Sequence, residues 1–395
     1  MKLKKILLLL FVLSFTQLYA QFQLSEKATL SVITCGSGQE LYSTFGHSAF
    51  RVHDALNGID RIYNYGTFDF NTPNFYLNFA KGKLTYQLSV ESFDNFIRIY
   101  NYEKRWVKTQ VLNLKSQEVQ EVFNYLENNA ESENKNYKYD FFYNNCATKI
   151  EDVIKIVLKE KVHFTNEHIT SHKSHRDLIE DYTNQTLWGK FGIDLALGSV
   201  IDKEAKKNDY KFLPDYIYQS FANATIIHNN EEQALVLKEL SILKFNSQKN
   251  SNFITTPFGI ILLLSLLIAF VTFKNHQSQK RSKWLDFSIY FTTGFIGIVV
   301  LLLWFATDHT ATYNNYNVLW AFAPNLFVSF YLLKTKLPGW LKQYNKFLLL
   351  LILSMMVLWV LKIQVFNHAL IPLFVAIIMR YLYINKKKTI NGTIK

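Results

Sequence analysis

The chain has 395 residues, a formal net charge of +12 and a mean hydropathy close to zero. This average hides two different parts, because polar residues are interleaved through the first part and long apolar runs dominate the last. Much of the basic excess lies in short segments beside those runs, where lysine sets membrane orientation, so nucleic acid is a poor candidate partner. The sequence lacks Gly-x-Ser-x-Gly, His-Glu-x-x-His and phosphate-binding glycine motifs, which excludes the common serine hydrolase, zincin and nucleotide-binding classes.

The first twenty residues are typical of a secretory signal peptide. Lysines stand at the start, an apolar core covers 6–15, and the segment ends in the small residue Ala20. An uncleaved anchor helix is the alternative, but the apolar core is short for a bilayer. Export would place both cysteines of the chain, Cys35 and Cys146, in an oxidising compartment.

The rest of the chain divides into an exported domain at 21–251 and a transmembrane domain at 252–388. Only the second contains apolar runs near the length of a spanning helix, and these lie at 253–273, 284–307, 316–333, 347–363 and 368–384. Lysine and arginine follow the first, third and fifth runs and are missing from the two other loops. Because positive loops stay in the cytoplasm, we predict a multi-pass inner-membrane protein with a periplasmic N-terminal domain and a cytoplasmic C-terminus.

The exported domain begins with a predicted hairpin that carries a histidine. Strand-like runs at 29–34, 48–52 and 61–65 are separated by turn residues, and the dipeptide Asn57-Gly58 favours a tight hairpin. His47 would therefore stand at the start of a strand, held rigidly. A lone histidine is more often structural than catalytic, so this position needs a partner.

Cys146 is the more informative residue, because it leads directly into a helical pattern of apolar residues. Asn144 or Asn145 can cap that helix, and the cysteine would then occupy the first turn, where the helix dipole lowers a thiol pKa. Cys146 and His47 together could form a nucleophile and its base. The alternative is a structural disulfide between Cys35 and Cys146, natural for two exported cysteines.

The third member of such a site should orient His47, and the returning strand offers Asn64 and Tyr65. We choose Asn64, with His53 in reserve because it shares a strand face with His47, and a purely structural role for this strand is equally open. Four histidines at 163–175 are irregularly spaced and have no companion cysteine, so we expect a solvated surface and predict neither a metal nor a cofactor.

Longer motifs carry a family resemblance. They are the runs 34–47, 63–70, 145–146, 191–195, 212–215 and 308–320. With a histidine first and a cysteine later at a helix start, the chain resembles circularly permuted papain-like enzymes of the NlpC and lecithin:retinol acyltransferase type. More specifically it is similar to the Lnb-type lipoprotein N-acyltransferases of Bacteroidota. The resemblance implies an α+β papain-like domain followed by a bundle of about five transmembrane helices.

The resemblance also implies an activity. An acyl chain would pass from a phospholipid through a thioester on Cys146 to the N-terminal amine of a diacylated lipoprotein, with the membrane as a third partner. Cys35, Tyr65 and Asn145 are expected near the site, and Asp308 and His309 would either contact a lipid headgroup, close against the exported domain or form an ordinary loop. A membrane-anchored cysteine peptidase or amidase, or a scaffold with a structural disulfide, remains open as an alternative function.

Overall fold

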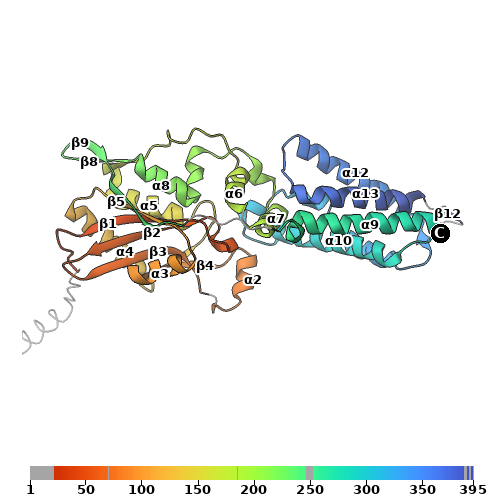
Figure 1. Cartoon of the computed structure of the whole chain (residues 1–395), viewed down its shortest axis with the longest axis horizontal. Helices are drawn as coiled ribbons and strands as arrows, with labels where there is room; N and C mark the ends of the chain where they lie inside the picture. The colour runs from red at the N-terminus through yellow and green to blue at the C-terminus, as the bar shows by residue number, and fades with distance from the viewer. Residues whose placement is uncertain are drawn as a thin grey trace, which may run out of the picture.

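The computed structural model describes residues 22–69, 71–184, 186–245 and 252–386, with two short strands at 389–390 and 393–394. Its exported domain and its helical bundle lie end to end along the long axis of the molecule (Figure 1). The predicted signal peptide at 1–20 lies outside the described residues.

A seven-stranded antiparallel sheet with the order β10-β5-β1-β2-β3-β4-β6 forms the centre of the exported domain. Its strands are β1 (Thr29–Cys35), β2 (His47–Asp54), β3 (Ile59–Thr67), β4 (Thr85–Ser92), β5 (Val107–Leu112), β6 (Asn136–Lys138) and β10 (Val236–Leu243). The predicted hairpin is confirmed, because β2 and β3 pair across the turn that contains Gly58, whose φ is +67°. A smaller sheet joins β7 (Val162–His163), β8 (Thr225–His228) and β9 (Glu231–Ala234).

Helices cover both faces of the large sheet, because successive strand residues point to opposite sides. Residues such as Val52 and Tyr63 pack under α4 (Ser116–Ala130), α5 (Cys146–Leu158) and α8 (Pro214–Ala222). The alternate residues, including Ala49 and Ile62, pack under α3 (Phe93–Tyr102). The helical and strand content confirms the predicted α+β class. Two further helices, α6 (His175–Thr183) and α7 (Leu187–Ala196), lead toward the bundle.

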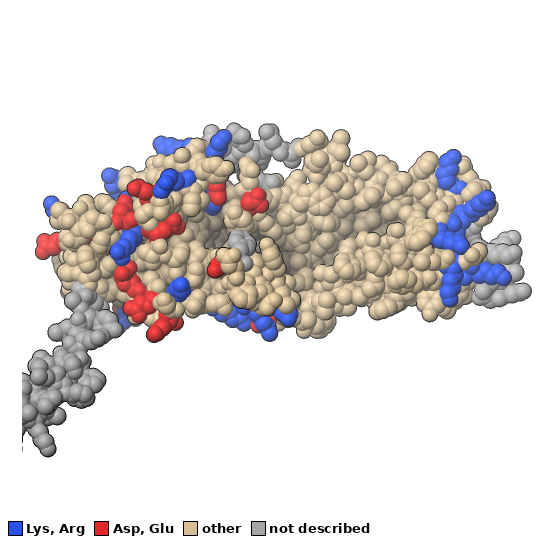
Figure 2. Space-filling view, turned by 90° about the horizontal axis from the view of Figure 1, so that it is seen from below, with Lys and Arg blue, Asp and Glu red and all other residues tan. Residues whose placement is uncertain are grey.

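Four helices in the described part of the chain are long and apolar enough to cross a membrane. They are α9 (Pro257–Ser278), α10 (Lys283–Phe305), α12 (Leu341–Val360) and the helix His368–Lys386, which consists of the 3₁₀ turn η8 (His368–Leu370) and α13 (Ile371–Lys386). On the face seen in Figure 2, Lys and Arg gather at the end of the bundle far from the exported domain, and the surface between is uncharged. The loops that the sequence predicts to be cytoplasmic would lie at this end of the bundle.

The predicted third span at 316–333 is wrong as a single helix. The segment holds a 3₁₀ turn, η7 (Tyr316–Leu319), and a short helix, α11 (Asn325–Tyr331), with non-helical backbone before Pro324. Proline and asparagine disfavour a continuous helix at this point. Non-helical backbone is tolerated at membrane depth only where protein buries it.

Two glycines of α10 let the backbone of the broken segment pack directly against this helix, which buries its non-helical part. A Cβ at Gly297 would clash with the carbonyl oxygen of Ala321, and one at Gly294 would clash with the backbone nitrogen of Leu326. Arg281, just before α10, donates to the carbonyl oxygens of Leu332 and Lys334 at the other end of the segment. The broken segment therefore runs antiparallel to α10 along most of its length.

A buried arginine joins the exported domain to the bundle. Arg176 on α6 is 1 % exposed; its Nη1 lies 2.9 Å from Asp194 Oδ1 and its Nε lies 2.7 Å from Asp202 Oδ1. The same carboxylates accept from the bundle side, Asp194 from Asn367 Nδ2 at 2.7 Å and Asp202 from the Val365 N–H at 3.1 Å. One charge cluster therefore fixes both parts relative to each other.

Replacing Arg176 by alanine leaves two buried carboxylates without their cation, so we expect a loss of about 3–5 kcal/mol of stability. The measurement is unfolding of the purified full chain in detergent. Lys173→Ala is the matched control, because the Lys173–Asp181 pair is partly exposed and should cost no more than about 1 kcal/mol. Equal losses in the two variants would contradict a special role for the buried cluster.

Candidate active site

His47 and Asn64 meet on one face of the large sheet. His47 is the first residue of β2, and Asn64 lies on the neighbouring strand β3. The distance between His47 Nε2 and Asn64 Oδ1 is 2.5 Å. Since Oδ1 can only accept, Nε2 carries the proton in this contact, and Nδ1 is the nitrogen left for another partner. The geometry brings together the two residues that the sequence suggested as base and orienting amide.

Cys146 is the first residue of α5, as the sequence predicts, and Asn145 is the cap. The Oδ1 of Asn145 accepts from the N–H groups of Ala147 and Thr148, both at 2.9 Å. Its Nδ2 donates to Phe212 O at 2.7 Å, which ties the helix start to the chain before α8. Buried at 3 % exposure, Asn145 holds the backbone that carries the thiol and does not face a substrate.

A bulge in β3 lets the helix start approach the histidine. The β3–β4 register shifts between Asn64 and Thr67, and Gly66 within this shift has φ +84°. A Cβ at Gly66 would lie 3.1 Å from the Cβ of Cys146. The strand therefore needs glycine both for its backbone conformation and for the space that the cysteine occupies.

The thiol and the imidazole stabilise each other's charged forms. Burial alone would raise the pKa of Cys146, but the charge and hydrogen bond of His47, together with the backbone N–H groups of Ser48 and Ala147, lower that pKa below its ordinary value. Burial likewise opposes the imidazolium, yet the thiolate of Cys146 and the hydrogen bond that Asn64 Oδ1 accepts from Nε2 leave the pKa of His47 raised. The helix dipole at the start of α5 acts in the same direction on the thiol. This arrangement favours a thiolate–imidazolium pair.

The second cysteine is a neighbour of the site but has a different character. Cys35 pairs with His47 in the β1–β2 register, and both cysteines are free in this structure. Burial raises the pKa of Cys35 to about 12, against the opposing effects of Arg105 and the Tyr100 hydroxyl. A thiol in that environment is inert. The scaffold alternative required a disulfide between Cys35 and Cys146, and the structure does not contain that bond.

Tyr65 and His53 do not take part in the contact between His47 and Asn64. Tyr65 points to the sheet face opposite Asn64 and packs against Tyr137, with ring centroids 6.0 Å apart. His53 pairs with Thr29 at the far end of β2, six residues from His47 and therefore about 20 Å away.

Asp308 and His309 close against the exported domain. The N–H of Asp308 donates to the carbonyl oxygen of Lys81 at 2.9 Å, and the His309 ring contacts the carbonyl oxygen of Phe79 at 3.1 Å. The carboxylate of Asp308 lies 3.6 Å from Lys138 Nζ. Among the three roles that the sequence left open, the geometry favours closure against the exported domain.

Three residues near the site were not singled out from the sequence. Tyr100 and Arg105 surround Cys35, and the Arg105 guanidinium lies 4.5 Å from the Tyr100 ring centroid. Burial raises the pKa of Glu91 on β4, against the opposing effects of Asn64 and His47, so this carboxyl extends the line that begins at His47. The pairing of distant strands brings these groups together, so no local sequence motif could have predicted that they lie near the site.

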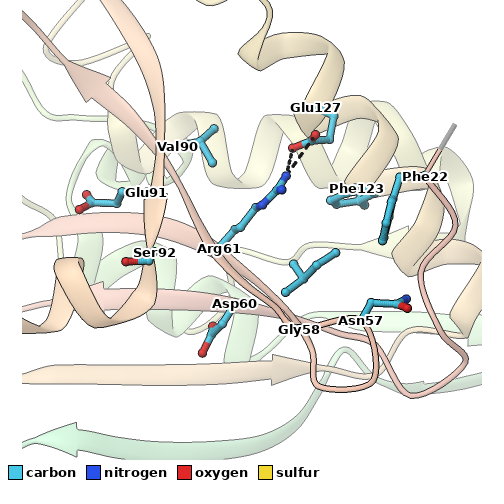
Figure 3. Close-up of a pocket in the computed structure, with 11 residues that line it drawn as sticks. Phe22, Asn57, Gly58, Asp60, Arg61, Val90, Glu91, Ser92, Phe123 and Glu127 are labelled. Carbon is cyan, nitrogen blue, oxygen red and sulfur yellow. Dashed lines mark hydrogen bonds and ion pairs between the residues drawn. The ribbon is translucent and has the colours of Figure 1, made fainter. Parts of the chain in front are cut away.

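A separate pocket of about 610 Å³ opens at the other end of the β2–β3 hairpin (Figure 3). Phe22, Arg61, Phe123 and Glu127 line it, and Arg61 pairs with Glu127 across its wall. Neither Cys146 nor His47 lines this pocket, so it is not the place where the thiol chemistry would occur.

The fold and site together define a membrane-tethered protein with a thiol, imidazole and amide arranged for nucleophilic chemistry on the exported side. Residues 14–181 match the model of the Lnb N-terminal periplasmic domain, and residues 248–389 match the model of the Lnb transmembrane domain. The chain belongs to the Lnb-type lipoprotein N-acyltransferase family and is a membrane protein with a periplasmic N-terminal domain. No curated protein and no solved structure gives a significant match.

The lowered thiol pKa predicts alkylation of Cys146 that persists below pH 8, because a lower pKa keeps more thiolate at a given pH. In His47→Ala the rate profile should move to higher pH, toward the ordinary value of about 8.5. Mass spectrometry after timed iodoacetamide treatment measures both profiles. Cys35 should stay unlabelled in Cys146→Ser, and an unchanged profile in His47→Ala would rule out the ion pair.

Gly66→Ala should lower the alkylation rate of Cys146, since the new methyl strains the backbone and crowds the thiol. Gly58→Ala is the matched control: φ there is +67°, but no atom lies within 4 Å of the added Cβ. Both variants should lose about 1 kcal/mol of stability from backbone strain, while only Gly66→Ala changes the labelling rate. Identical labelling in both would show that the bulge does not position the cysteine.

Proposed function

We propose that the chain is a membrane-bound lipoprotein N-acyltransferase that works through a thioester on Cys146. The donor is a phospholipid, and the acceptor is the N-terminal amine of a diacylated lipoprotein. The observation that carries this proposal is a free cysteine at a helix start, beside a histidine held by an asparagine, in a domain docked on a membrane bundle. This order of histidine, strand hairpin and helix-start cysteine supports a permuted papain-like arrangement.

The first half-reaction forms the acyl-enzyme. The thiolate of Cys146 attacks the ester carbonyl carbon of the phospholipid, and the electron pair of the carbonyl moves onto oxygen. As the tetrahedral intermediate collapses, the carbon–oxygen ester bond breaks and the imidazolium of His47 gives its proton to the departing alkoxide. The products are a lysophospholipid and a thioester. Asn64 keeps the ring oriented while its charge changes.

The second half-reaction transfers the acyl group. The lipoprotein amine attacks the thioester carbonyl, and neutral His47 accepts the amine proton. The carbon–sulfur bond then breaks, the thiolate of Cys146 returns and an amide forms. Since the reaction begins and ends with the same thiolate–imidazolium pair, no cofactor is consumed.

The oxyanion of both intermediates needs hydrogen-bond donors. Because Asn145 already occupies the N–H groups of Ala147 and Thr148, we assign the backbone N–H of Cys146 itself to this role. The cap thus positions the helix start and limits which amides remain for the substrate.

The membrane arrangement fits two lipid substrates. We propose that the periplasmic domain extends over 21–251 and the transmembrane domain over 252–388, in the inner membrane with a cytoplasmic C-terminus. The buried Arg176 cluster fixes the thiol at a constant height above the bundle. Fixed height and orientation raise the effective concentration of membrane-embedded substrates at the site.

Incubation with a phospholipid of defined acyl chains should add one acyl mass to the intact protein, on Cys146, and a diacylated lipopeptide should then discharge it. In Cys146→Ser, the acyl-enzyme should be missing and transfer should fall by about 10³-fold or more. Cys35→Ser is the matched control and should retain transfer. Cleavage of the lipopeptide without acylation would favour a peptidase or amidase and overturn the proposal.

A further inference from the structure

The short helix α2 (Phe75–Ala80) exposes large apolar side chains. Tyr76 is 77 % exposed, Leu77 is 51 % exposed and Phe79 is 53 % exposed, whereas Phe75 is buried against the domain. Three such groups in one helix of six residues form a concentrated apolar surface. Surfaces of this kind mark contact with a partner or a membrane.

The position of α2 indicates that its apolar surface contacts a membrane and not a partner protein. The carbonyl oxygens of Phe79 and Lys81 bind His309 and Asp308, three to four residues after the end of the spanning helix α10 at Phe305. A Cβ at Gly82 would lie 3.1 Å from the His309 backbone nitrogen, so this junction is closely packed. α2 is therefore attached close to the end of the spanning helix α10, on the side of the exported domain that faces the bundle (Figure 1).

The charges around α2 match the headgroup region of a bilayer. Lys81 and Lys83 follow the helix directly, and both side chains are exposed. Lys138 contacts the carboxylate of Asp308 at the same junction and is 73 % exposed. Apolar residues beside exposed lysines are typical of helices that lie in the membrane interface, where the ammonium groups meet lipid phosphates.

A row of aromatic rings connects α2 with the thiol. Phe75 packs on Phe68 with centroids 5.6 Å apart, Phe68 on Tyr86 at 5.4 Å, and Tyr86 stacks on Tyr139 at 4.0 Å. Tyr139 precedes Asp140, whose backbone pairs with Asn144 two residues before Cys146, so the row ends at the turn that leads to the thiol.

We propose that α2 is seated in the periplasmic leaflet and presents phospholipid to Cys146 along this aromatic row. The seating stands independently of the reaction, whereas the presentation rests on the proposed acyl transfer. A lipid whose headgroup lies near Lys81 and Lys83 would have its ester bonds at the level of α2. There the apolar side chains of α2 would contact its acyl chains in place of neighbouring lipid molecules. The donor would then reach the thiol without passing through water.

The first test uses a photo-crosslinking residue, p-benzoylphenylalanine, in place of Leu77 in the full chain. Leu56 is the matched control: it is also an exposed leucine, 68 % against 51 %, but it lies at the hairpin turn at the opposite end of β2 from His47. In vesicles of phosphatidylethanolamine and phosphatidylglycerol, position 77 should crosslink to lipid about ten times more than position 56. Equal lipid yields, or adducts at 77 to protein only, would overturn the seating.

The second test separates seating from catalysis. In the double variant Leu77→Ser, Phe79→Ser, the KM for vesicle phospholipid should rise about tenfold, while turnover of a water-soluble short-chain thioester donor stays unchanged. Leu56→Ser should change neither. An equal loss with both donors would overturn the presentation role. Failure of Cys146 to form any acyl-enzyme would count against the proposed function alone, because crosslinking at position 77 does not require turnover.

Discussion

The buried guanidinium of Arg176 between Asp194 and Asp202 is the constraint on which the rest of the molecule depends. Burying three charges has a large desolvation cost, which only close pairing and further hydrogen bonds offset. Here the additional donors come from Asn367 and Val365 in the bundle, so the cluster is fully satisfied only when both parts are docked. The pairing of these charges therefore selects one relative placement of the domain and the bundle, together with the hydrogen bonds of Asp308 and His309 at the same junction.

The geometry of the site follows from a second constraint, the convergence of a helix start with a strand start. The side chain of Asn145 fixes the first turn of α5, and the bulge at Gly66 gives it room beside β3. His47 is held from the other side by Asn64. None of these elements is a flexible loop, so the thiol and the imidazole are preorganised before any substrate arrives.

Local sequence signals predicted much of this arrangement. The apolar pattern after Cys146 and the preceding asparagines located a helix start, and the Asn57-Gly58 turn fixed the hairpin that brings Asn64 beside His47. The bulge at Gly66 could not be predicted, because it depends on the register between β3 and β4. The partners of Arg176 were equally hidden, since pairing over long sequence separations leaves no periodic pattern. The third predicted span is not one continuous helix, because hydropathy measures apolar content and not helical continuity.

The broken segment between η7 and α11 has a consequence for how the protein enters the membrane. Its non-helical stretch before Pro324 leaves backbone groups that hydrocarbon cannot satisfy, so the segment has no stable position in lipid by itself. Gly294 and Gly297 provide the complementary surface only after α10 is in place. Because α10 precedes the segment in the chain, its glycine surface is already synthesised when the segment emerges, and the segment enters the bilayer by pairing with α10.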